Sequence, residues 1–535
     1  MTVLRTVRPD GTVRPEGPVR PAVDGDPRDR RLGPPTWTAE APPAMSRVRV
    51  LATSALGVAA VAWYLSWLLR PERVGHPVLF GALVVAELFN VTQALGFWWT
   101  ASRGGARAHR ARTADGVAEV DVLVPVYGEP VEVVEPTVAA AVAMRGARVH
   151  VALLDDGGSP EMEALARRHG VRYVRRTVHS GAKAGNINHA LGLVDAPYVA
   201  VFDCDHVPSP DFFERTLGHL DDPDVAMVQT PQWYANAPDN DVADAAAAQQ
   251  TLFFGPIARG KDARGAMFCC GTNMVFRREA LDDVGGFPED SVTEDFSLSL
   301  SLHERGWRTA YVSEVLAQGL GPEDMASYAS QQQRWARGCL SALPSALRAR
   351  LPWRTRLQYL LSASYFLTGW TVLLYMCLPV IRILTGAQPV AGADADEFFT
   401  HFAPYFGLAL LMVAMAGAGA YTWRAFALQF ASWWIHVDAT IRVLRGRPGR
   451  FVVTPKRGSG GVQLRAVWPS ALAAVVLVTV ATIGLAADRS PGTLNNVAFV
   501  AVHLVVLGTG MRSAWRSPVR ASVGARRSDE VVAAA

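Results

Sequence analysis

A pair of closely spaced aspartates is the plainest candidate in this chain for metal or phosphate chemistry. The motif "FDCDH" directly follows the apolar run "YVAV" and places Asp203 and Asp205 on either side of Cys204. Side chains alternate along a strand, so both carboxylates should project to one side and Cys204 to the other. Such a pair suits Mg²⁺ or Mn²⁺, which takes one or two protein carboxylates and completes its shell with substrate phosphates. Solvated turn residues are the ordinary alternative for this motif alone.

Two further motifs could act on a diphosphate. Asp155 and Asp156 end a neighbouring strand in "LLDDGGSP", where the glycines permit a tight turn. In "AKAGNINHAL", Lys183 stands just before a helix N-terminus, which is a natural site for a diphosphate. An ordinary surface lysine is an equally good interpretation of this motif by itself.

A second pair of acids begins a predicted helix. Glu294 and Asp295 in "SVTEDF" lie in a first turn that Ser291 or Thr293 could cap. Acids are also common in this position because of the helix dipole alone.

A later motif combines polar and aromatic side chains on one helix face. "SQQQRWARG" spaces Gln331, Arg334 and Trp335 at i, i+3 and i+4. An interfacial helix with an aromatic anchor would show the same pattern.

Most of these motifs fall between about Val117 and Ala317, a segment that alternates between strand and helix patterns. That order predicts a mostly parallel, doubly wound α/β sheet, in which ligands bind beyond the carboxyl ends of the strands. Both "LLDDGG" and "FDCDH" are expected at those ends. Strands are predicted at 119–127, 148–156, 171–176 and 198–203, and helices at 131–144, 160–170 and 184–194.

Apolar segments flank this region, and six of them approach the roughly 20 residues that a helix needs to cross a bilayer core. Basic residues cluster before the first, after the second and after the sixth, whereas residues 385–399 hold no Lys or Arg. We therefore predict that both termini and the long middle region face the cytosol. The predicted spans are 48–69, 78–99, 357–384, 402–423, 467–487 and 494–511.

Residues 424–444 could form a seventh span, but Gln429, His436, Asp438 and Arg442 are costly in hydrocarbon. A seventh crossing would also place the basic stretch "RGRPGRFVVTPKRG" outside. An amphipathic helix lying in the inner interface satisfies both observations.

Composition argues against several classes of function. The chain of 535 residues has a net charge of only +4, which argues against a nucleic-acid binder. Its five cysteines lack the spacing of a zinc site or a disulfide framework, so reduced thiols are expected. The N-terminal region is rich in Pro, Arg and Asp and is predicted to be disordered.

In this order and on this fold, the motifs resemble those of processive family 2 glycosyltransferases, most closely bacterial cellulose synthases. The resemblance covers roughly Arg47 to Arg516 and rests on "DDGG", "KAGN", "DCD", "TED" and the Q-x-x-R-W motif at 331–335. "FCCGTN" at 268–273 resembles that family's acceptor-side motif, and "FVVTPK" at 451–456 resembles its gating loop. Joint occurrence makes these motifs specific where each alone is not.

The resemblance implies a multi-pass membrane protein with a cytosolic α/β domain of the GT-A type, Rossmann-like and doubly wound. On that fold Asp155 and Asp156 would hold the uridine of UDP-glucose. Lys183 would lie near the diphosphate, Arg334 would pair with it through its forked donors, and Gln331 would assist.

The same resemblance implies a metal-assisted, inverting transfer. Asp203 would contact the nucleotide and, with Asp205, carry Mg²⁺ or Mn²⁺, which offsets charge on the departing UDP. Asp295, with Glu294 beside it, would be the general base that takes the proton of the acceptor hydroxyl. A direct attack of this kind converts an α-linked donor into a β-linked product.

The remaining implied sites concern the growing chain and the closing of the pocket. Trp335 offers a flat face for the terminal sugar. The gating loop would swing over the donor and exclude water. The implied contacts are Cys270, Gly271 and Thr272 beside the acceptor sugar, and Phe451, Val453 and Thr454 in the gating loop.

The sequence also departs from the family pattern. The family has a histidine two residues before the lysine of "KAGN"; here that position is Gly181, with His179 displaced, and "TPH" is replaced by "TPQ" at Gln232. Only residues 521–535 follow "RSPVR", too few for a cyclic di-GMP-binding PilZ barrel. We expect no direct control by cyclic di-GMP.

Together these features predict an ordered set of regions. They are a disordered N-terminus (1–45), two spans (46–100), the glycosyltransferase domain (101–322), interfacial helices with Q-x-x-R-W (323–356), two spans (357–424), an interfacial helix and gating loop (425–466), two spans (467–512) and a basic tail (513–535).

The leading hypothesis is a plasma-membrane synthase that extends a β-glucan, most simply cellulose, from UDP-glucose and extrudes it through its own spans. Rivals keep the reaction but make a β-1,3-glucan, a mixed-linkage glucan or a mannan. More distant rivals are a lipid-linked sugar transferase and a non-catalytic scaffold or transporter. The expected partners are the UDP-sugar donor, the growing polysaccharide, membrane lipid and a possible periplasmic or cell-wall accessory protein, with no nucleic acid. The sequence indicates no particular oligomeric state.

Overall fold

The computed structural model describes residues 46–447 and 463–514. The predicted gating-loop residues Phe451, Val453 and Thr454 lie outside these ranges, as do the predicted disordered N-terminus and nearly all of the predicted tail.

The predicted α/β segment forms a seven-stranded sheet in the order β3-β2-β1-β4-β8-β6-β9. Only β8 runs antiparallel to its neighbours, which confirms the prediction of a mostly parallel sheet. The central strands are buried on both faces and consist largely of Val, Leu and Ala, as buried parallel strands require. The strands are β1 (Glu119–Val126), β2 (Arg148–Asp155), β3 (Arg172–Val174), β4 (Tyr198–Val201), β6 (Val225–Gln229), β8 (Met274–Arg277) and β9 (Arg308–Tyr311).

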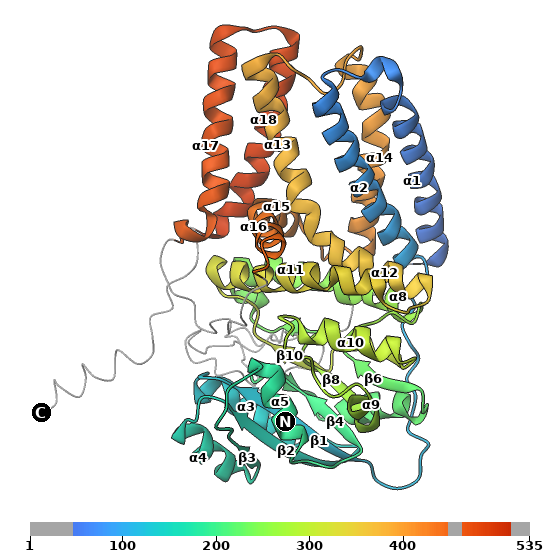
Figure 1. Ribbon diagram of the computed structural model, residues 1–535, viewed down its shortest axis with the longest axis vertical. Coiled ribbons are helices and arrows are strands. Elements are labelled where there is room, and N and C mark those ends of the chain that lie inside the picture. The colour runs from blue at the N-terminus through green and yellow to red at the C-terminus, as the bar shows by residue number, and fades with distance from the viewer. Residues whose placement is uncertain (1–45, 448–462, 515–535) are drawn as a thin grey trace, which may run out of the picture. The chain divides into compact units, whose positions relative to one another are not determined.

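Helices cover both faces of this sheet (Figure 1). Val122 and Val124 of β1 join the core beneath α3 (Val131–Val142) and α4 (Pro160–His169). Leu123, which points the other way, joins the core beneath α5 (Ala182–Leu191), α9 (Arg278–Asp283) and α10 (Glu294–Glu304). Alternate side chains of one strand thus pack into two separate cores, one on each face of the sheet. The prediction of a doubly wound sheet is confirmed.

The strand order reverses at β1. The chain adds β2 and β3 on one side of β1 and places β4 on the other side. Strand β2 is therefore not the direct neighbour of β4, as the sequence had suggested, because β1 lies between them. The point of reversal in such a sheet is where ligands bind.

The loops beyond the sheet carry short additional elements. A second sheet has the order β5-β10-β7. These elements are β5 (Val207–Pro208), β7 (Trp233–Tyr234), β10 (Ala317–Gly319), α6 (Phe212–Thr216), α7 (Asp241–Leu252) and α8 (Ala258–Asp262).

Within the described residues, six helical segments are long and apolar enough to cross a membrane. They are α1 (Arg47–Leu68), α2 (Pro77–Ala101), the segment Trp353–Thr385 that ends in α13 (Thr368–Thr385), α14 (Ala395–Ala416), α17 (Leu464–Ala487) and α18 (Pro491–Met511). Helix α14 begins and ends earlier than predicted, because the Asp394 side chain caps it by accepting from Glu397 N at 2.8 Å. Positive φ angles at Ala418 and Gly419 follow its end.

The predicted helix at 424–444 is two helices, α15 (Trp423–Ala431) and α16 (Trp433–Leu444). Ser432 separates them, and its hydroxyl donates to Leu428 O at 2.7 Å, a back-bond that bends helices. Neither helix is among the six candidate spans.

The Q-x-x-R-W motif lies on α11 (Met325–Arg348), which Figure 1 shows between the sheet and the apolar helices. One hydrophobic cluster joins α11 to α10 and to α12 (Trp353–Ser364). Its members include Phe296 and Leu300 of α10, Ala342 and Ala346 of α11, and Tyr359 and Ala363 of α12. The helix that begins with Glu294 and Asp295 is thereby held against the motif helix.

Candidate active site

Lys183 links several of the predicted site residues beyond the carboxyl end of β4. Its Nζ donates to Asp203 Oδ1 at 2.5 Å and to Gly271 O at 2.6 Å. Burial by itself would lower the pKa of Lys183, but the charges of Asp203 and of the two acids that begin α10 outweigh it and raise that pKa. The lysine predicted to lie near a diphosphate is therefore part of a charged cluster with three predicted acids.

Gly271 brings the acceptor-side motif over this cluster. A Cβ at this position would lie 3.2 Å from Asp295 Oδ2 and 3.8 Å from Lys183 Nζ. Its φ of +85° is one that glycine adopts without strain. The next residue, Thr272, accepts a hydrogen bond at its Oγ1 from Asp203 N at 2.8 Å. The motif "FCCGTN" thus touches both "DCD" and "TED", three segments far apart in sequence.

Asp295 has the electrostatic setting of a proton acceptor at neutral pH. Burial raises the pKa of Asp295 to about 7, and the charge of Glu294 adds to this effect. The N–H of Phe296, which donates to Asp295 Oδ1 at 2.8 Å, and the charges of Lys183 and Arg334 act in the opposite direction. A carboxyl that titrates near the working pH is suited to general base catalysis.

The start of α10 is positioned by packing and not by the predicted cap. Neither Ser291 nor Thr293 caps α10 with its side chain, so that prediction was wrong. Ser291 Oγ instead lies 2.8 Å from Ser297 Oγ. Thr293 packs so closely on α11 that a Cβ at Gly338 would lie 2.2 Å from Thr293 Cγ2.

The residues after β4 include a cluster that could hold a metal ion. Asp203, Asp205 and His206 each offer one ligand atom, and these atoms lie within 4.8 Å of one another. Asp205 and His206 are buried, with Asp205 Oδ1 3.4 Å from His206 Nδ1. Cys204 packs into the core beneath α3 and α4, away from the two carboxylates as predicted, but the strand predicted to reach residue 203 ends at Val201, and Cys204 and Asp205 belong to a turn. The two carboxylates fit a hard divalent cation.

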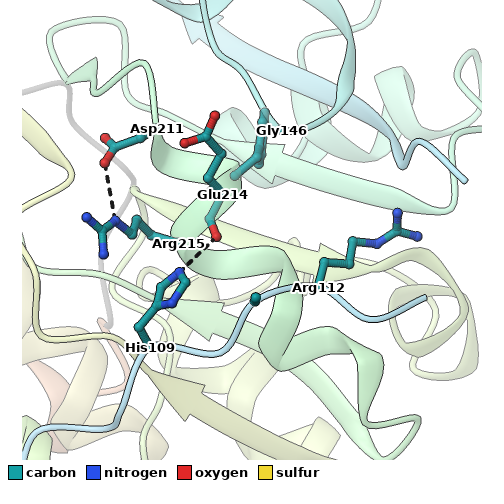
Figure 2. A pocket seen from close by; sticks show the side chains of 8 residues that line it. His109, Arg112, Gly146, Asp211, Glu214 and Arg215 are labelled. Carbon is teal, nitrogen blue, oxygen red and sulfur yellow. Dashed lines mark hydrogen bonds and ion pairs between the residues drawn. The ribbon is translucent and has the colours of Figure 1, made fainter. Parts of the chain in front are cut away.

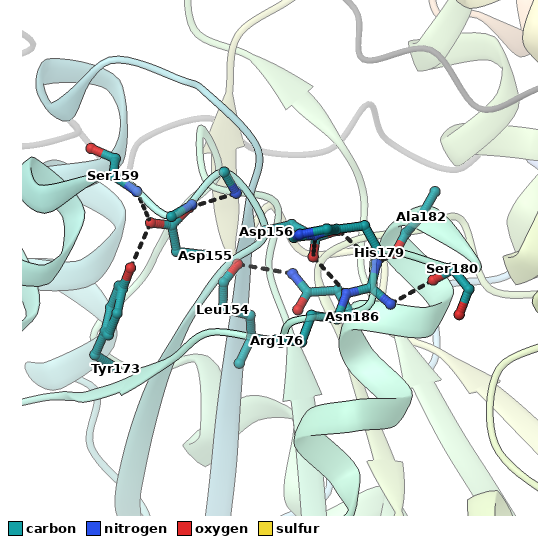
Figure 3. A network of polar contacts seen from close by, with 12 residues as sticks. Leu154, Asp155, Asp156, Ser159, Tyr173, Arg176, His179, Ser180, Ala182 and Asn186 are labelled. Atoms are coloured by element: carbon teal, nitrogen blue, oxygen red, sulfur yellow. Dashed lines mark hydrogen bonds and ion pairs between the residues drawn. The ribbon is translucent and has the colours of Figure 1, made fainter.

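Asp155 is surrounded by donors from its own loop and sheet edge (Figure 3). Its Oδ1 accepts from Gly157 N at 2.9 Å and Gly158 N at 3.0 Å. Its Oδ2 accepts from Ser159 N at 2.7 Å and from the Tyr173 hydroxyl at 2.9 Å. This completely buried carboxylate therefore shapes the turn after β2.

Asp156 is held by a buried arginine (Figure 3). Arg176 donates to its two oxygens at 2.5 Å and 2.6 Å, and His179 Nδ1 lies 3.0 Å from its Oδ1. Burial alone would raise the pKa of Asp156, but hydrogen bonds from Arg176 and His179 more than offset it, and that pKa is lowered. Arg176 also donates to Ser180 O and Ala182 O, at the start of α5. His179, which is displaced from the position of the histidine in the family pattern, thus contacts the "DDGG" motif.

The motif on α11 brings the charge of its arginine within range of the acid cluster. The charge of Arg334 acts on Asp295, which places this side chain near the acids of α10. Trp335 is partly buried and packs on a hydrophobic cluster that includes Leu340, Phe366 and Ala439. Gln331 shares the helix, as its spacing predicts.

Several side chains that contribute to this region were not identified as site residues from the sequence. Gln232, noted only as a departure from the family pattern, donates to Cys270 O at 2.7 Å. Lys261 of α8 is completely buried and donates to Gln358 O at 2.9 Å and Gln358 Oε1 at 3.1 Å. Burial lowers the pKa of Lys261 to about 7. The other two are Arg176, which no motif marks, and His206, which ends the "FDCDH" motif but was not identified as a candidate ligand.

A hollow of about 510 Å³ lies elsewhere on the domain (Figure 2). Two of its polar side chains contact neighbours in the lining, since Arg215 Nε donates to Asp211 Oδ2 at 3.3 Å and His109 Nε2 lies 3.3 Å from the backbone oxygen of Glu214. No predicted site residue lines this hollow. The convergence of acids around Lys183 is therefore the better candidate.

Comparison with known proteins identifies relatives of most of the chain. Residues 198–435 match the family described as glycosyl transferase family group 2. Cellulose synthase 2 of Novacetimonas hansenii is 32% identical over 475 residues, which are 83% of this chain and 30% of that protein. A cellulose synthase catalytic subunit [UDP-forming] of Pseudomonas fluorescens (strain SBW25) is 32% identical over 460 residues, 82% of this chain and 62% of that protein. The chain thus spans less than two thirds of the length of these relatives.

A solved structure supports the fold. The mannosyltransferase PcManGT from Pyrobaculum calidifontis, in complex with GDP-Man and Mn²⁺, superposes with a TM-score of 0.53 and 17% sequence identity. The match covers 69% of this chain and 99% of that one. At this identity the likeness concerns the fold, which is of the GT-A glycosyltransferase type.

Proposed function

We propose that this chain, whose residues 198–435 match the glycosyl transferase family group 2 model, is a processive inverting synthase of a β-linked glucan. The donor is UDP-glucose, the product is β-1,4-glucan (cellulose), and the polymer leaves through the membrane helices. Relatives named as cellulose synthases, aligned over 82–83% of this chain, support the choice of reaction.

The observation that carries this proposal is the meeting of four motifs in one place. Lys183 contacts Asp203 and Gly271, and Gly271 in turn lies beside Asp295. A base, an acid suited to a metal, a cation for a diphosphate and the acceptor-side loop are thereby brought together. A scaffold or transporter would gain nothing from an acid held at a pKa of about 7 beside such a loop.

Each residue of the cluster has a definite task in this reaction. Asp295 removes the proton from the acceptor hydroxyl as that oxygen attacks the anomeric carbon, and burial, together with the charge of Glu294, keeps the pKa of Asp295 high. Asp203 and Asp205 hold Mg²⁺ or Mn²⁺, which when bound neutralises charge on the departing diphosphate. Lys183 supplies a further cation on the same side.

The other predicted contacts complete the donor and acceptor sites. Arg334 and Gln331 contact the diphosphate, and Trp335 stacks on the terminal sugar. Asp155 and Asp156 border the uridine, and Asp155 acts through the loop amides that it holds. The acceptor sugar lies along Cys270, Gly271 and Thr272, while Phe451, Val453 and Thr454 close over the donor.

The membrane helices set the direction of transfer. The arginines at the inner ends of the predicted spans support a glycosyltransferase domain on the cytosolic side of the plasma membrane. The polymer then emerges on the opposite side, where a periplasmic or cell-wall protein could receive it.

The test is synthesis by the purified protein. Membrane-reconstituted protein is incubated with Mg²⁺ or Mn²⁺ and each UDP- or GDP-sugar, and the product is digested with linkage-specific glycosidases. We expect polymer from UDP-glucose that a β-1,4-glucanase degrades, and none from Asp295→Asn. Polymer resistant to β-1,4-glucanase would establish another linkage, and polymer made from a GDP-sugar would establish another donor. If no sugar were transferred from any donor, the proposed glycosyltransferase activity would be wrong.

A further inference from the structure

Three arginines and two tryptophans meet where α2 ends and α12 begins. The Arg264 guanidinium lies 4.3 Å from the ring centre of Trp99, and that of Arg354 lies 5.3 Å from that of Trp353. The two tryptophan rings stack on one another with centres 6.1 Å apart. Arg103 is close enough for its charge to act on Arg264, as does that of Arg354. We call these five residues the Arg–Trp cluster.

The positive charge of this cluster is not balanced by the protein. Among the residues that the structure describes, none of its three arginines forms an ion pair. Asp262, two positions before Arg264, is engaged by Arg107 at 2.7 Å. Burial, with the charges of Arg103 and Arg354, lowers the pKa of Arg264 to about 10. Like charges held together in this way favour binding of an anion.

Arg264 also fixes one edge of the cluster to the end of a helix. Its Nη1 donates to Thr100 O at 3.0 Å, and its Nη2 donates to Trp99 O and to Ser102 Oγ. Carbonyls at a helix C-terminus attract cations, so this guanidinium is already partly satisfied. Arg103 and Arg354 are exposed and keep their donors available to a ligand from outside.

The beginning of α12 adds to the same field. No side chain caps its N-terminus, and its first turn contains no acid. The uncapped N–H groups and the positive end of the helix dipole therefore lie beside Arg354, which belongs to that turn.

The depth of the cluster matches the surface of a membrane. Helix α2 ends at Ala101, and the candidate span that contains α12 begins at Trp353. Trp353 is 64% exposed, although it stands at the end of an apolar span. Tryptophan in this position is typical of the layer in which lipid headgroups lie.

We propose that the Arg–Trp cluster binds the phosphate of an anionic phospholipid in the leaflet nearest the glycosyltransferase domain. Arg103 and Arg354 contact the headgroup phosphate, and Trp353 lies along the glycerol and upper acyl region. A lipid fits better than a free phosphate because the exposed indole offers it an apolar contact. This site is separate from the sugar-transfer chemistry and does not depend on it.

The test measures lipid retention directly. Full-length protein in detergent is titrated with phosphatidylglycerol or with phosphatidylcholine, and bound lipid is counted by native mass spectrometry. We expect wild-type protein to prefer phosphatidylglycerol and the variant Arg103→Gln/Arg354→Gln to bind it about tenfold or more weakly, since each basic residue near an anionic surface contributes about 1 kcal/mol. Raised salt should weaken the wild-type binding.

The matched control changes two exposed arginines at the first turn of α1, Arg47→Gln/Arg49→Gln, on which no tryptophan of the described residues stacks. This variant should bind phosphatidylglycerol as the wild type does. Equal loss in both variants, or no loss in the first, would overturn the proposal. Competition by inorganic phosphate as strong as that by the lipid would also overturn it, in favour of a free phosphate. Should the double variant fail to fold, Arg354→Gln alone, at an exposed position, gives the same comparison.

Discussion

Closely spaced aspartates lie where strand β2 ends and just beyond strand β4, yet the protein surrounds the two sets of acids differently. At the end of β2, Asp155 accepts hydrogen bonds from three loop amides and a tyrosine hydroxyl, and Asp156 accepts from the guanidinium of Arg176. Beyond the end of β4, Lys183 donates to both Asp203 and the carbonyl oxygen of Gly271. Asp295 lies close to them, and burial raises its pKa to about 7.

The difference separates two uses of a carboxylate. An acid whose oxygens accept several donors is held ionised, as the lowered pKa of Asp156 shows, and its main effect is on the shape of the chain. An acid that is buried beside another negative charge has a raised pKa and can take up a proton. We expect changes at the β2 acids to affect stability and, through the loop that borders the uridine, donor binding, whereas changes around Lys183 should affect mainly the rate of transfer.

The most severe test of this difference is Asp295→Asn. Loss of a general base lowers rates by about 10²–10⁴-fold, so polymer synthesis should fall at least about 100-fold. The same change should stabilise the protein at pH 8. Because burial raises the pKa of Asp295 to about 7, its ionisation opposes folding as pH rises from about 4, where an unfolded aspartate titrates, to about 7.

Both results are measured on one preparation, by UDP release and by the midpoint of thermal unfolding. The variant should lose synthesis while its midpoint at pH 8 rises by a few degrees. Synthesis at the wild-type rate would show that Asp295 is not the base.

Arg176→Met should have the largest effect on stability. It leaves Asp156 buried without its two-point partner, and breaking a buried pair in this way costs about 3–5 kcal/mol. The matched control is Arg167→Met, which removes an exposed pair with Glu163 and should cost less than about 1 kcal/mol. Thermal unfolding of the two variants measures the contrast. Equal midpoints would mean that the Arg176 pair contributes no more than a surface contact.

Much of this arrangement could be predicted from the sequence. Apolar runs of Val, Leu and Ala, separated by turn residues and amphipathic patterns, placed β1, β2, β4 and the helices between them to within a few residues. Asp203 and Asp205 do lie together while Cys204 enters the core, but β4 ends at Val201 and Cys204 and Asp205 form a turn, so strand geometry alone does not account for this arrangement. The spans followed from composition, except where the Asp394 cap moved α14.

What the sequence did not predict depends on contacts between distant segments. Arg176 meets Asp156 only because β3 pairs with β2, and Gln232 meets Cys270 only because their loops adjoin. Thr293, which does not cap α10 with its side chain, packs on Gly338 of α11, far along the chain. Lys261 is surrounded by α12 and a phenylalanine ring, and nothing in its own sequence neighbourhood indicates burial.

Lys183→Met should move the pH dependence of catalysis. The positive charge of Lys183 lowers the pKa of Asp295, so its removal should raise that pKa further above about 7. The acid limb of the pH–rate profile should then shift to higher pH, together with a loss of activity. Lys183→Arg, which keeps the charge, is the control and should leave the limb near its original place. An unshifted limb in the methionine variant would show that Lys183 does not act on the base.

His179→Gln should have the smallest effect, and it completes the comparison from the β2 side. His179 is half exposed and lies 3.0 Å from Asp156 Oδ1, an oxygen that already accepts from Arg176 at 2.5 Å. Glutamine retains a donor, and an exposed pair contributes less than about 1 kcal/mol, so the unfolding midpoint should change by a small fraction of the change in Arg176→Met. Thermal unfolding and the KM for the donor sugar measure the result. A loss of stability comparable with that of Arg176→Met would mean that the imidazole, and not the guanidinium, holds Asp156 in place. A large rise in KM with unchanged stability would instead place His179 against the donor, and the β2 acids would then belong with those around Lys183.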